Sequence, residues 1–353
     1  MKEIMIQLTD LGFDPQTIEA LTAKGIPGRI SRESHGLFTV LTESGEINCH
    51  LPGKDLGTLT GTSQYPLTGD FVITDEAGLI REILPRQNLV TRGDLFSAAL
   101  SEGLVANCDY IFVVISLNQD FHLRKIRRFL ITASSSGAQP VLILTKADLN
   151  SPSENDAFLT QAQELTNVPI IVTRMDQSAS IQPILTLLSG GKTAALLGAS
   201  GVGKSTLINL ILGEARLKTN GIRSSDDQGR HTTTHREIIV IPNVGCLIDT
   251  PGMRRIYLQD DGDAVEDVFG PLTRIMTECK FANCTHHNEP GCAVNAALRS
   301  GKLKASDLED YYEMLREARF FETKAKVREK EQSRKLVRSS KKPRQKSWKD
   351  PDQ

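Results

Sequence analysis

The chain has 353 residues, of which 39% are hydrophobic and 24% charged, and its formal net charge is −1. This length is too great for one small core and predicts two or three domains, and the composition is that of a soluble globular protein rather than a disordered or fibrous one. The early acidic residues predict that the chain has no signal peptide, and the lack of a long apolar run predicts no membrane span. We therefore expect a cytoplasmic protein that makes no membrane contact.

The N-terminal part of the sequence divides into a lead-in and a barrel. Residues 1–27 are expected to form a short helical or irregular lead-in. Between residues 28 and 96 the short apolar runs include GLFTVLT, GEINCHLP, GDFVITD and GLIREILP, separated by Gly-rich turns. Regular short strands of this kind predict a small β-barrel, and their number suits an oligonucleotide-binding (OB) type barrel. An SH3-like barrel fits the same pattern.

The pattern changes between residues 97 and 270. Continuous apolar runs are typical of strands covered on both faces, and helical periodicity fills several of the intervals between them. Repeated strand–helix units predict a doubly wound, parallel α/β sheet. The strand-like runs lie at 110–117, 140–146, 168–174, 193–200, 236–242 and 245–250.

The segment GASGVGKS at 198–205, here called the phosphate loop, matches the G-x-x-x-x-G-K-[ST] pattern between a predicted strand and a predicted helix. Its glycines let backbone N–H groups surround phosphate oxygens at a helix N-terminus. Lys204 is expected to reach the β- and γ-phosphates, and Ser205 to bind Mg²⁺. The predicted phosphate-binding residues are Gly198, Ala199, Ser200, Gly201, Val202, Gly203, Lys204, Ser205 and Thr206.

A second motif predicts which base is bound. The tetrad Thr145-Lys146-Ala147-Asp148 ends a strand-like run. The Asp148 carboxylate can accept hydrogen bonds from N1–H and the 2-amino group of guanine, which adenine does not offer, and Lys146 would lie along the base. Thr145 stands where asparagine is usual, but its hydroxyl can still tie the tetrad to the phosphate loop. The segment Val172–Arg174 replaces the usual Ser-Ala pair on the other side of the base.

Two further segments complete the predicted γ-phosphate site. Asp249 and Gly252 belong to the segment DTPG. The Asp249 carboxylate can hold Mg²⁺ through its water shell, and the Gly252 N–H can donate to the γ-phosphate. One of Thr232, Thr233 and Thr234 in GRHTTTH would close on Mg²⁺ as a switch loop does, and we assign Thr233.

The group that orients the attacking water is less obvious from the sequence. Met253 follows DTPG, where many GTPases carry a glutamine. Since methionine cannot orient water, we assign His231 as the candidate catalytic residue beside Lys204 and Thr233. A purely supporting role for His231 in its loop remains the alternative.

In this chain the guanine tetrad precedes the phosphate loop, the threonines and DTPG. The usual GTPase order begins with the phosphate loop, so the sequence predicts a circular permutation. A doubly wound sheet tolerates such a rearrangement because its chain ends lie at the surface.

Residues 271–320 contain a cluster of cysteines that predicts a metal site. Three thiolates and one imidazole suit a closed, structural zinc site with one Zn²⁺ per chain. His287 competes with His286 on spacing alone. The other cysteines (Cys49, Cys108 and Cys246) are isolated in apolar surroundings and are expected to be buried, reduced thiols. The predicted zinc ligands are Cys279, Cys284, His286 and Cys292.

Residues 321–353 are expected to form a basic tail, helical at first and then disordered. Between Lys324 and Lys349 basic residues far outnumber acidic ones. Such a segment suits contact with RNA phosphates, and a solubilising tail explains the composition equally well.

The barrel, the permuted GTPase motifs and the Cys₃His cluster, in this order over about residues 28–320, resemble the ribosome-small-subunit-dependent GTPases (the RsgA, or YjeQ, family). The resemblance implies an OB fold at the N-terminus and a role in late maturation of the small ribosomal subunit. It also implies that the subunit stimulates GTP hydrolysis, which times release. The implied partners are the subunit with its rRNA and GTP or GDP with Mg²⁺, and we expect a monomer.

Two other classes of function remain open at this stage. In one, the chain is a plain ATPase and the tetrad is incidental; competition between GTP and ATP would distinguish it. In the other, the chain is a nucleic-acid-binding protein with a merely structural nucleotide site, which would hydrolyse nothing even with ribosomal subunits present.

Overall fold

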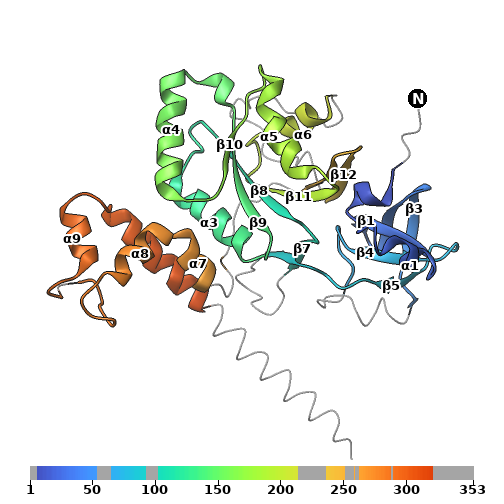
Figure 1. Ribbon diagram of the computed structural model, residues 1–353, viewed down its shortest axis with the longest axis horizontal. Helices are drawn as coiled ribbons and strands as arrows, with labels where there is room; N and C mark the ends of the chain where they lie inside the picture. The colour runs from blue at the N-terminus through green and yellow to red at the C-terminus, as the bar shows by residue number, and fades with distance from the viewer. Residues whose placement is uncertain are drawn as a thin grey trace, which may run out of the picture.

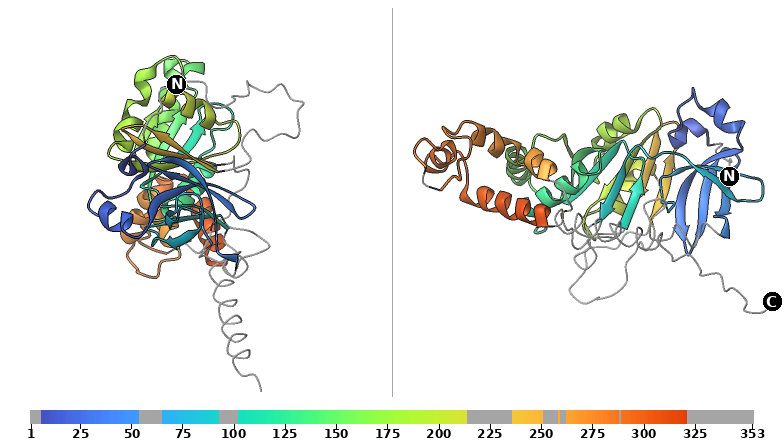
Figure 2. Two further views of the ribbon diagram at one scale, coloured as in Figure 1. Left: turned by 90° about the vertical axis from the view of Figure 1, so that its right-hand side faces the viewer. Right: turned by 90° about the horizontal axis from the view of Figure 1, so that it is seen from below.

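The structure, a computed structural model of the chain, describes residues 6–53, 65–92, 102–213, 236–250, 258, 262–287 and 289–320. Three parts lie in a row: an N-terminal β-sheet, a central α/β domain and a helical C-terminal part (Figure 1). The view from below shows the same order along the long axis (Figure 2).

The N-terminal sheet is antiparallel and nearly closes on itself. Its strand order within the described residues is β3-β2-β1-β4-β5, and a parallel bridge between His50 and Leu79 joins its two ends. Ile30, Phe38 and Val72 are fully buried in its core, which is separate from those of the central domain. The four predicted strand-like runs all form strands. The strands are β1 (Ile26–Ser34), β2 (Leu37–Thr42), β3 (Gly45–His50), β4 (Phe71–Thr74) and β5 (Ile80–Ile83).

The lead-in fills the junction between this sheet and the central domain. It forms η1 (Leu8–Leu11) and α1 (Ile18–Thr22). Leu8, Leu11 and Phe13 are buried in the same core as strands of the central sheet.

A buried arginine joins the same two parts. Arg29, on β1, has no exposed surface, and its guanidinium lies 4.6 Å from the Phe71 ring centre. Its N–H groups donate hydrogen bonds to backbone and hydroxyl oxygens on both sides of the junction. These bonds hold the sheet and the domain in one orientation. The acceptors are Leu11 O at 2.7 Å, Gly69 O at 3.1 Å, Asn107 O at 2.6 Å and Thr193 Oγ1 at 2.6 Å.

A two-stranded antiparallel pair, β6 (Leu89–Arg92) and β7 (Glu102–Ala106), connects the two parts. The sequence did not predict it, because each run is short and has no clear alternation. Gly103 permits close packing, since a Cβ there would lie 2.3 Å from the Leu67 side chain.

The central sheet has the order β10-β9-β8-β11-β13-β12 in the part of the chain that is described. All neighbouring pairs but one are parallel. Each of its strands overlaps a predicted apolar run, and β9 and β11 begin one residue before theirs. They are β8 (Tyr110–Ser116), β9 (Gln139–Thr145), β10 (Ile170–Val172), β11 (Lys192–Leu197), β12 (Glu237–Ile241) and β13 (Gly245–Asp249).

The expectation of a wholly parallel sheet is wrong for the edge strand β12. It pairs with β13 in the antiparallel sense, with Ile239 opposite Leu247. Only residues 242–244 separate the two strands, whereas a parallel pair needs a crossover of about a dozen residues or more. Asn243, with φ of 60°, closes the turn.

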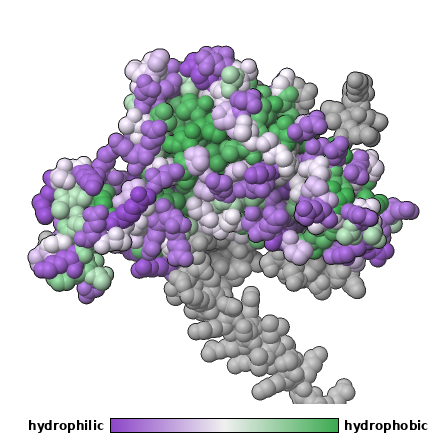
Figure 3. Space-filling view, viewed as in Figure 1, coloured by the Kyte–Doolittle hydropathy of each residue, from purple (hydrophilic) through white to green (hydrophobic). Residues whose placement is uncertain are grey.

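Successive residues of the central strands point into two different cores, as the two-residue period requires. On β8, Ile111 and Val113 face one core, while Phe112 and Val114 face the other. Helices α3 (Leu123–Ser134) and α4 (Pro152–Leu165) cover the first face, and α5 (Gln182–Leu188) and α6 (Lys204–Leu212) cover the second. In Figure 3 the more hydrophobic residues gather near β10, α5 and α6, whereas the outer parts are largely hydrophilic.

The C-terminal part packs on α3. It comprises α7 (Gly262–Val268), α8 (Gly270–Thr277), α9 (Ala293–Arg299) and a helix at residues 305–320, called the C-terminal helix. Phe269 and Met314 belong to the same apolar core as α3. The predicted basic tail, residues 321–353, lies outside the described residues. None of the described helices is both long and apolar enough to cross a membrane.

Candidate nucleotide site and metal-ligand cluster

The order of the strands determines where the candidate nucleotide site lies. The chain runs outward from β8 through β9 to β10 and then returns to the other side of β8 as β11. In open α/β sheets a ligand crevice lies at such a reversal, beyond the carboxyl ends of the strands. The tetrad begins at the last residue of β9, the phosphate loop follows β11, and Asp249 ends β13. The three motifs therefore meet at one edge of the sheet although the chain visits them in permuted order.

The phosphate loop has the backbone that phosphate binding requires. Gly201 and Gly203 have φ of 83° and 102°, values that favour glycine. At Gly198 a Cβ would lie 2.6 Å from the Val114 carbonyl oxygen, so the close approach to β8 also needs glycine. Helix α6 begins at Lys204, immediately after these residues. Its N-terminal N–H groups and positive end therefore lie at the loop, as in an anion site.

Lys204 lies inside the loop and is only 8% exposed. Its Nζ donates to Gly198 O at 3.0 Å and Ala199 O at 3.1 Å. Burial lowers the pKa of Lys204 to about 8, and the nearby Asp249 carboxylate opposes this shift. Two neutral carbonyls compensate poorly for the lost water around an ammonium group. A bound phosphate would therefore strongly stabilise the Lys204 ammonium group.

The end of β13 is tied to β11 beside this lysine. Asp249 is 2% exposed, and the hydroxyl of the following residue, Thr250, donates to Leu196 O at 2.5 Å. Thr250 was not predicted as a site residue. Its position next to Asp249 in DTPG is the signal that could have drawn attention to it.

The tetrad contacts the phosphate loop directly. The Thr145 hydroxyl donates to Val202 O at 2.5 Å, and Lys146 Nζ donates to Gly201 O at 2.8 Å. A Cβ at Gly203 would lie 3.3 Å from Thr145 Oγ1, so glycine makes room for this contact. Thr145 stands where asparagine is usual, and its hydroxyl still links the tetrad to the phosphate loop.

The Asp148 carboxylate is held from the neighbouring strand. Its Oδ1 accepts a hydrogen bond from the Met175 N–H at 3.2 Å, and Met175 follows β10. Arg174 makes a bidentate pair with Asp176, at 3.0 and 2.9 Å. That pairing raises the pKa of Arg174, and Asp148 contributes less. The chain after β10 therefore supports the base-reading carboxylate through Met175, which lies one residue beyond the predicted Val172–Arg174.

The remaining predicted groups at the γ-phosphate cannot be placed. His231, Thr232, Thr233, Thr234, Gly252 and Met253 lie outside the described residues. Their roles stay predictions.

The predicted metal ligands converge. The candidate ligand atoms of Cys279, Cys284, His286 and Cys292 all lie within 4.8 Å of one another. Cys279 Sγ is 3.5 Å from His286 Nδ1 and 4.0 Å from Cys292 Sγ. Thiolates about 2.3 Å from a tetrahedral zinc would be about 3.8 Å apart, so the spacing fits such an ion.

The structure distinguishes the two histidines. His286 Nδ1 also lies 3.6 Å from Cys292 Sγ, whereas His287 Nδ1 donates to Thr285 O at 2.8 Å and is not among the converging ligand atoms. His286 has φ of 62°, which turns the chain so that its ring enters the cluster. His286 is therefore the member of the candidate metal cluster.

The loop between the ligands is braced by an acidic residue. The Glu289 carboxylate accepts from Thr285 N at 2.9 Å and from His287 N at 3.0 Å. Hydrogen bonds from Thr285 are the main reason that the pKa of Glu289 falls to about 2. Cys292 is the N-cap residue of α9, and its Sγ accepts a hydrogen bond from Asn295 N at 3.4 Å.

The three isolated cysteines are all buried and free, as expected. Burial raises the pKa of Cys49 to about 11, of Cys108 to about 12 and of Cys246 to about 11. They are therefore unreactive thiols.

Comparison with known proteins identifies the family. The family model for the RsgA GTPase matches residues 83–259. A small ribosomal subunit biogenesis GTPase RsgA of Streptomyces coelicolor is 39% identical over 93% of this chain and 91% of its own length. The protein of that name from Methanosarcina acetivorans is 38% identical over 86% of this chain and 82% of its own.

Known structures agree with the sequence comparisons. YjeQ from Thermotoga maritima superposes with a TM-score of 0.59 at 26% identity and covers 83% of this chain and 98% of that one. YloQ, described as a circularly permuted GTPase, superposes with a TM-score of 0.56 at 24% identity over 86% of this chain and 96% of its own, and supports the fold alone. The chain therefore belongs to the RsgA GTPase family and is a GTP hydrolase with the circularly permuted GTPase fold.

Proposed function

We propose that this protein hydrolyses GTP during late maturation of the small ribosomal subunit, that the subunit activates hydrolysis, and that hydrolysis times release. The observation that carries the proposal is the joining of the guanine tetrad to the phosphate loop by Thr145 and Lys146. That joining builds a guanine nucleotide site from motifs in permuted order. The names of the relatives supply the ribosomal role.

Within this function we assign nucleotide binding to the predicted residues. Asp148 reads the base, Lys204 binds the β- and γ-phosphates, and Gly252 donates to the γ-phosphate. Ser205 and Thr233 would bind Mg²⁺, and the Asp249 carboxylate would hold the ion through its water shell. Bound Mg²⁺ would neutralise charge on the phosphates. The other assigned residues are Thr145, Lys146, Ala147, Gly198, Ala199, Ser200, Gly201, Val202, Gly203 and Thr206.

The water-positioning group is assigned to His231 because Met253 offers no suitable polar atom. Contact with the small subunit would order the segment that carries His231 and so favour a competent state. Lys204 and Thr233 would complete the site at the γ-phosphate.

The flanking parts are assigned to RNA contact. The sheet of residues 28–96 is proposed to be an OB-type barrel, supported by its strand order and by the parallel bridge that closes it. Residues 97–270 would be the GTPase domain, 271–320 a zinc-binding domain and 321–353 a basic tail on rRNA, after the lead-in 1–27. We propose a cytoplasmic monomer.

The metal is proposed to be one structural zinc ion per chain. Three sulfur donors and one imidazole nitrogen are the donor set zinc prefers, and four protein ligands leave no open coordination position for catalysis. The ion would hold the C-terminal part in shape.

Cosedimentation with purified small ribosomal subunits tests the function. We expect the protein to sediment with the subunits in the presence of a non-hydrolysable GTP analogue and to remain in the supernatant with GDP. Equal sedimentation in both nucleotides would contradict the proposal that hydrolysis times release. No sedimentation in either would contradict the ribosomal role.

A further inference from the structure

The turn that follows β10 brings a backbone N–H to the carboxylate proposed to read the base. Residues 174–177 form a tight turn between β10 and the short helix η3 (Ser178–Ile181), and an antiparallel bridge joins Arg174 to Gln177. The Met175 N–H in this turn donates to Asp148 Oδ1 at 3.2 Å. A backbone group from a different segment of the chain therefore orients the Asp148 carboxylate.

Two buried residues fix this turn on the protein. Before the turn, Thr173 is 4% exposed, and its N–H donates to Leu144 O at 2.8 Å. Because Leu144 lies one residue before the tetrad, this bond holds the chain on β9 beside the candidate site. After the turn, Ile181 is buried in the core that α5 and α6 cover. Both ends of the turn therefore have fixed positions.

A serine hydroxyl holds the backbone inside the turn. Ser180 Oγ accepts a hydrogen bond from the Arg174 N–H at 3.0 Å and donates one to Arg174 O at 3.1 Å. The Gln177 N–H also donates to Arg174 O, at the longer distance of 3.5 Å. Of the two bonds to this carbonyl oxygen, the one from Ser180 is therefore the shorter and the stronger.

Peptide geometry connects the Ser180 contact with the Asp148 contact. Arg174 O and the Met175 N–H belong to one peptide unit, which is planar, so the two groups point in opposite directions across a trans bond. Any rotation of this unit turns both groups together. A hydroxyl that fixes the direction of the carbonyl oxygen therefore also fixes the direction of the N–H that Asp148 accepts from.

The bond from Met175 leaves Asp148 able to bind guanine. A carboxylate has about four acceptor sites on its two oxygens, so Oδ1 can keep the Met175 N–H and still accept from the base. Guanine presents two donors, N1–H and the 2-amino group, and both carboxylate oxygens must be aligned with them at once. A carboxylate that is already oriented loses less conformational freedom on binding than one that rotates freely.

We infer that Ser180 is a positioning residue for guanine selection: it fixes the peptide unit between Arg174 and Met175, and this unit orients the Asp148 carboxylate. The inference rests on the proposed role of Asp148 in reading the base. Ser180 touches no nucleotide in this role. It acts through the main chain of Arg174, whose guanidinium is paired with Asp176.

The test compares Ser180→Ala with two matched variants of the full chain. Ser180→Thr keeps a hydroxyl at this position, and Ser178→Ala removes one from the exposed first position of the same helix. GDP and inosine diphosphate are titrated into each protein, because inosine lacks the 2-amino group and uses only one of the two hydrogen bonds to Asp148. Amide exchange at Met175 is measured without nucleotide, and steady-state GTP turnover gives kcat and KM.

For Ser180→Ala we expect GDP to bind about fivefold more weakly, which is within the range that ordering one side chain costs. Inosine diphosphate should lose less than about twofold, because a single hydrogen bond tolerates a misaligned carboxylate better than a pair does. KM for GTP should rise while kcat stays within about twofold, since the change affects binding of the base and not the groups at the γ-phosphate.

The other measurements report on the turn itself. In Ser180→Ala the Met175 amide should exchange about tenfold faster, because the turn loses the hydroxyl and opens more often. Ser180→Thr should recover most of the GDP affinity, and Ser178→Ala should resemble the wild type in every measurement.

An unchanged ratio of GDP affinity to inosine diphosphate affinity in Ser180→Ala would overturn the inference, as would an equal change in Ser178→Ala. Wild-type exchange of the Met175 amide in Ser180→Ala would also overturn it, because the turn would then keep its geometry without the hydroxyl. If Ser180→Ala does not fold, Ser180→Cys replaces it, since a thiol is only a weak donor and acceptor, and the ratio should fall in the same way. A wild type that binds GDP and inosine diphosphate equally would instead count against the proposed role of Asp148.

Discussion

At the residue scale, we propose that Asp148 determines which nucleotide is bound. Asp148→Asn should weaken GTP binding by about 2–4 kcal/mol, because the amide cannot accept both hydrogen bonds from guanine and leaves buried polar groups unpaired. The variant should gain preference for xanthosine triphosphate, whose 2-oxo group can accept from the new amide. Direct titration with both nucleotides measures the change. An unaltered GTP affinity would remove the tetrad from the site.

Lys204 should make nucleotide affinity depend on pH. Because burial lowers its pKa to about 8, the empty site holds an ammonium group below that pH and a neutral amine above it. Phosphate favours the ammonium form, so GDP affinity should be highest below pH 8 and fall as pH rises above it, by up to about tenfold per unit. The stability of the ligand-free protein should change in the opposite sense, because the unfolded chain keeps this proton to higher pH.

The measurement is a GDP titration across the pH range from about 6 to 10, with Lys204→Ala as the control. The control should bind weakly and show little of this dependence. A wild-type affinity that stays constant through pH 8 would contradict the assignment of Lys204 to the phosphates.

At the scale of elements, Arg29 holds the N-terminal sheet on the central domain. Arg29→Met keeps much of the length but removes all four hydrogen bonds, and it leaves the buried carbonyls of Leu11 and Asn107 without this donor. The free energy of unfolding should fall by about 3 kcal/mol or more. Arg81→Met, at an exposed pair with Asp75, is the control and should cost less than about 1 kcal/mol. Equal denaturant midpoints for the two variants would show that the junction does not depend on Arg29.

The metal cluster should be a separable element. Purified protein should contain about one zinc ion per chain, and Cys284→Ser should lose it, because a closed four-ligand site tolerates no missing thiolate. The core that α5 and α6 cover consists of central-domain residues, so GDP affinity should remain. Metal analysis and a GDP titration on both proteins check this. A native protein without bound zinc would contradict the assignment.

Sequence patterns predicted those elements whose signal is local. The strands of the central sheet are continuous apolar runs, and the metal ligands lie within one short segment. The direction of β12 was predicted wrongly because hydrophobic periodicity carries no information on strand direction. The pair β6 and β7 was missed because each strand is too short to show a period.

Long-range side-chain contacts could not be predicted in the same way. Arg29 and Thr193 are 164 positions apart, and Arg128 and Glu317 are 189 apart. Nothing in the local sequence distinguishes these arginines from solvent-exposed ones. The contact of Thr145 could be predicted in part. The tetrad motif indicated a link to the phosphate loop, and in the structure the Thr145 hydroxyl donates to Val202 O.

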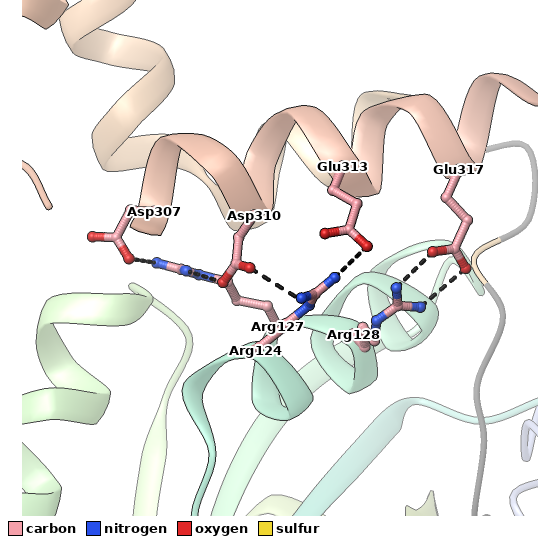
Figure 4. Close-up of polar contacts among 7 residues, drawn as sticks. All are labelled: Arg124, Arg127, Arg128, Asp307, Asp310, Glu313 and Glu317. Carbon is pink, nitrogen blue, oxygen red and sulfur yellow. Dashed lines mark hydrogen bonds and ion pairs between the residues drawn. The ribbon is translucent and has the colours of Figure 1, made fainter. Parts of the chain in front are cut away.

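At the scale of the whole molecule, the central domain, which carries the candidate nucleotide site, lies between the two parts proposed to contact RNA (Figure 1). Arg29 ties the N-terminal sheet to this domain, and ion pairs between α3 and the C-terminal helix, Arg127 with Asp307 among them, tie that helix to it (Figure 4). Such an arrangement lets contact at either end influence the site between them. A change in nucleotide state would in turn alter how both ends fit one partner.

The most direct measurement is GTP turnover with and without purified small ribosomal subunits, using ATP as the competing substrate and large subunits as the control. We expect slow GTP hydrolysis by the protein alone and a rise of at least about tenfold with small subunits, because partner contact completes the catalytic site. Excess ATP should not compete, and large subunits should not stimulate. Turnover that is unaffected by small subunits, or that ATP inhibits as strongly as unlabelled GTP does, would contradict a guanine-specific GTPase activated by the small subunit.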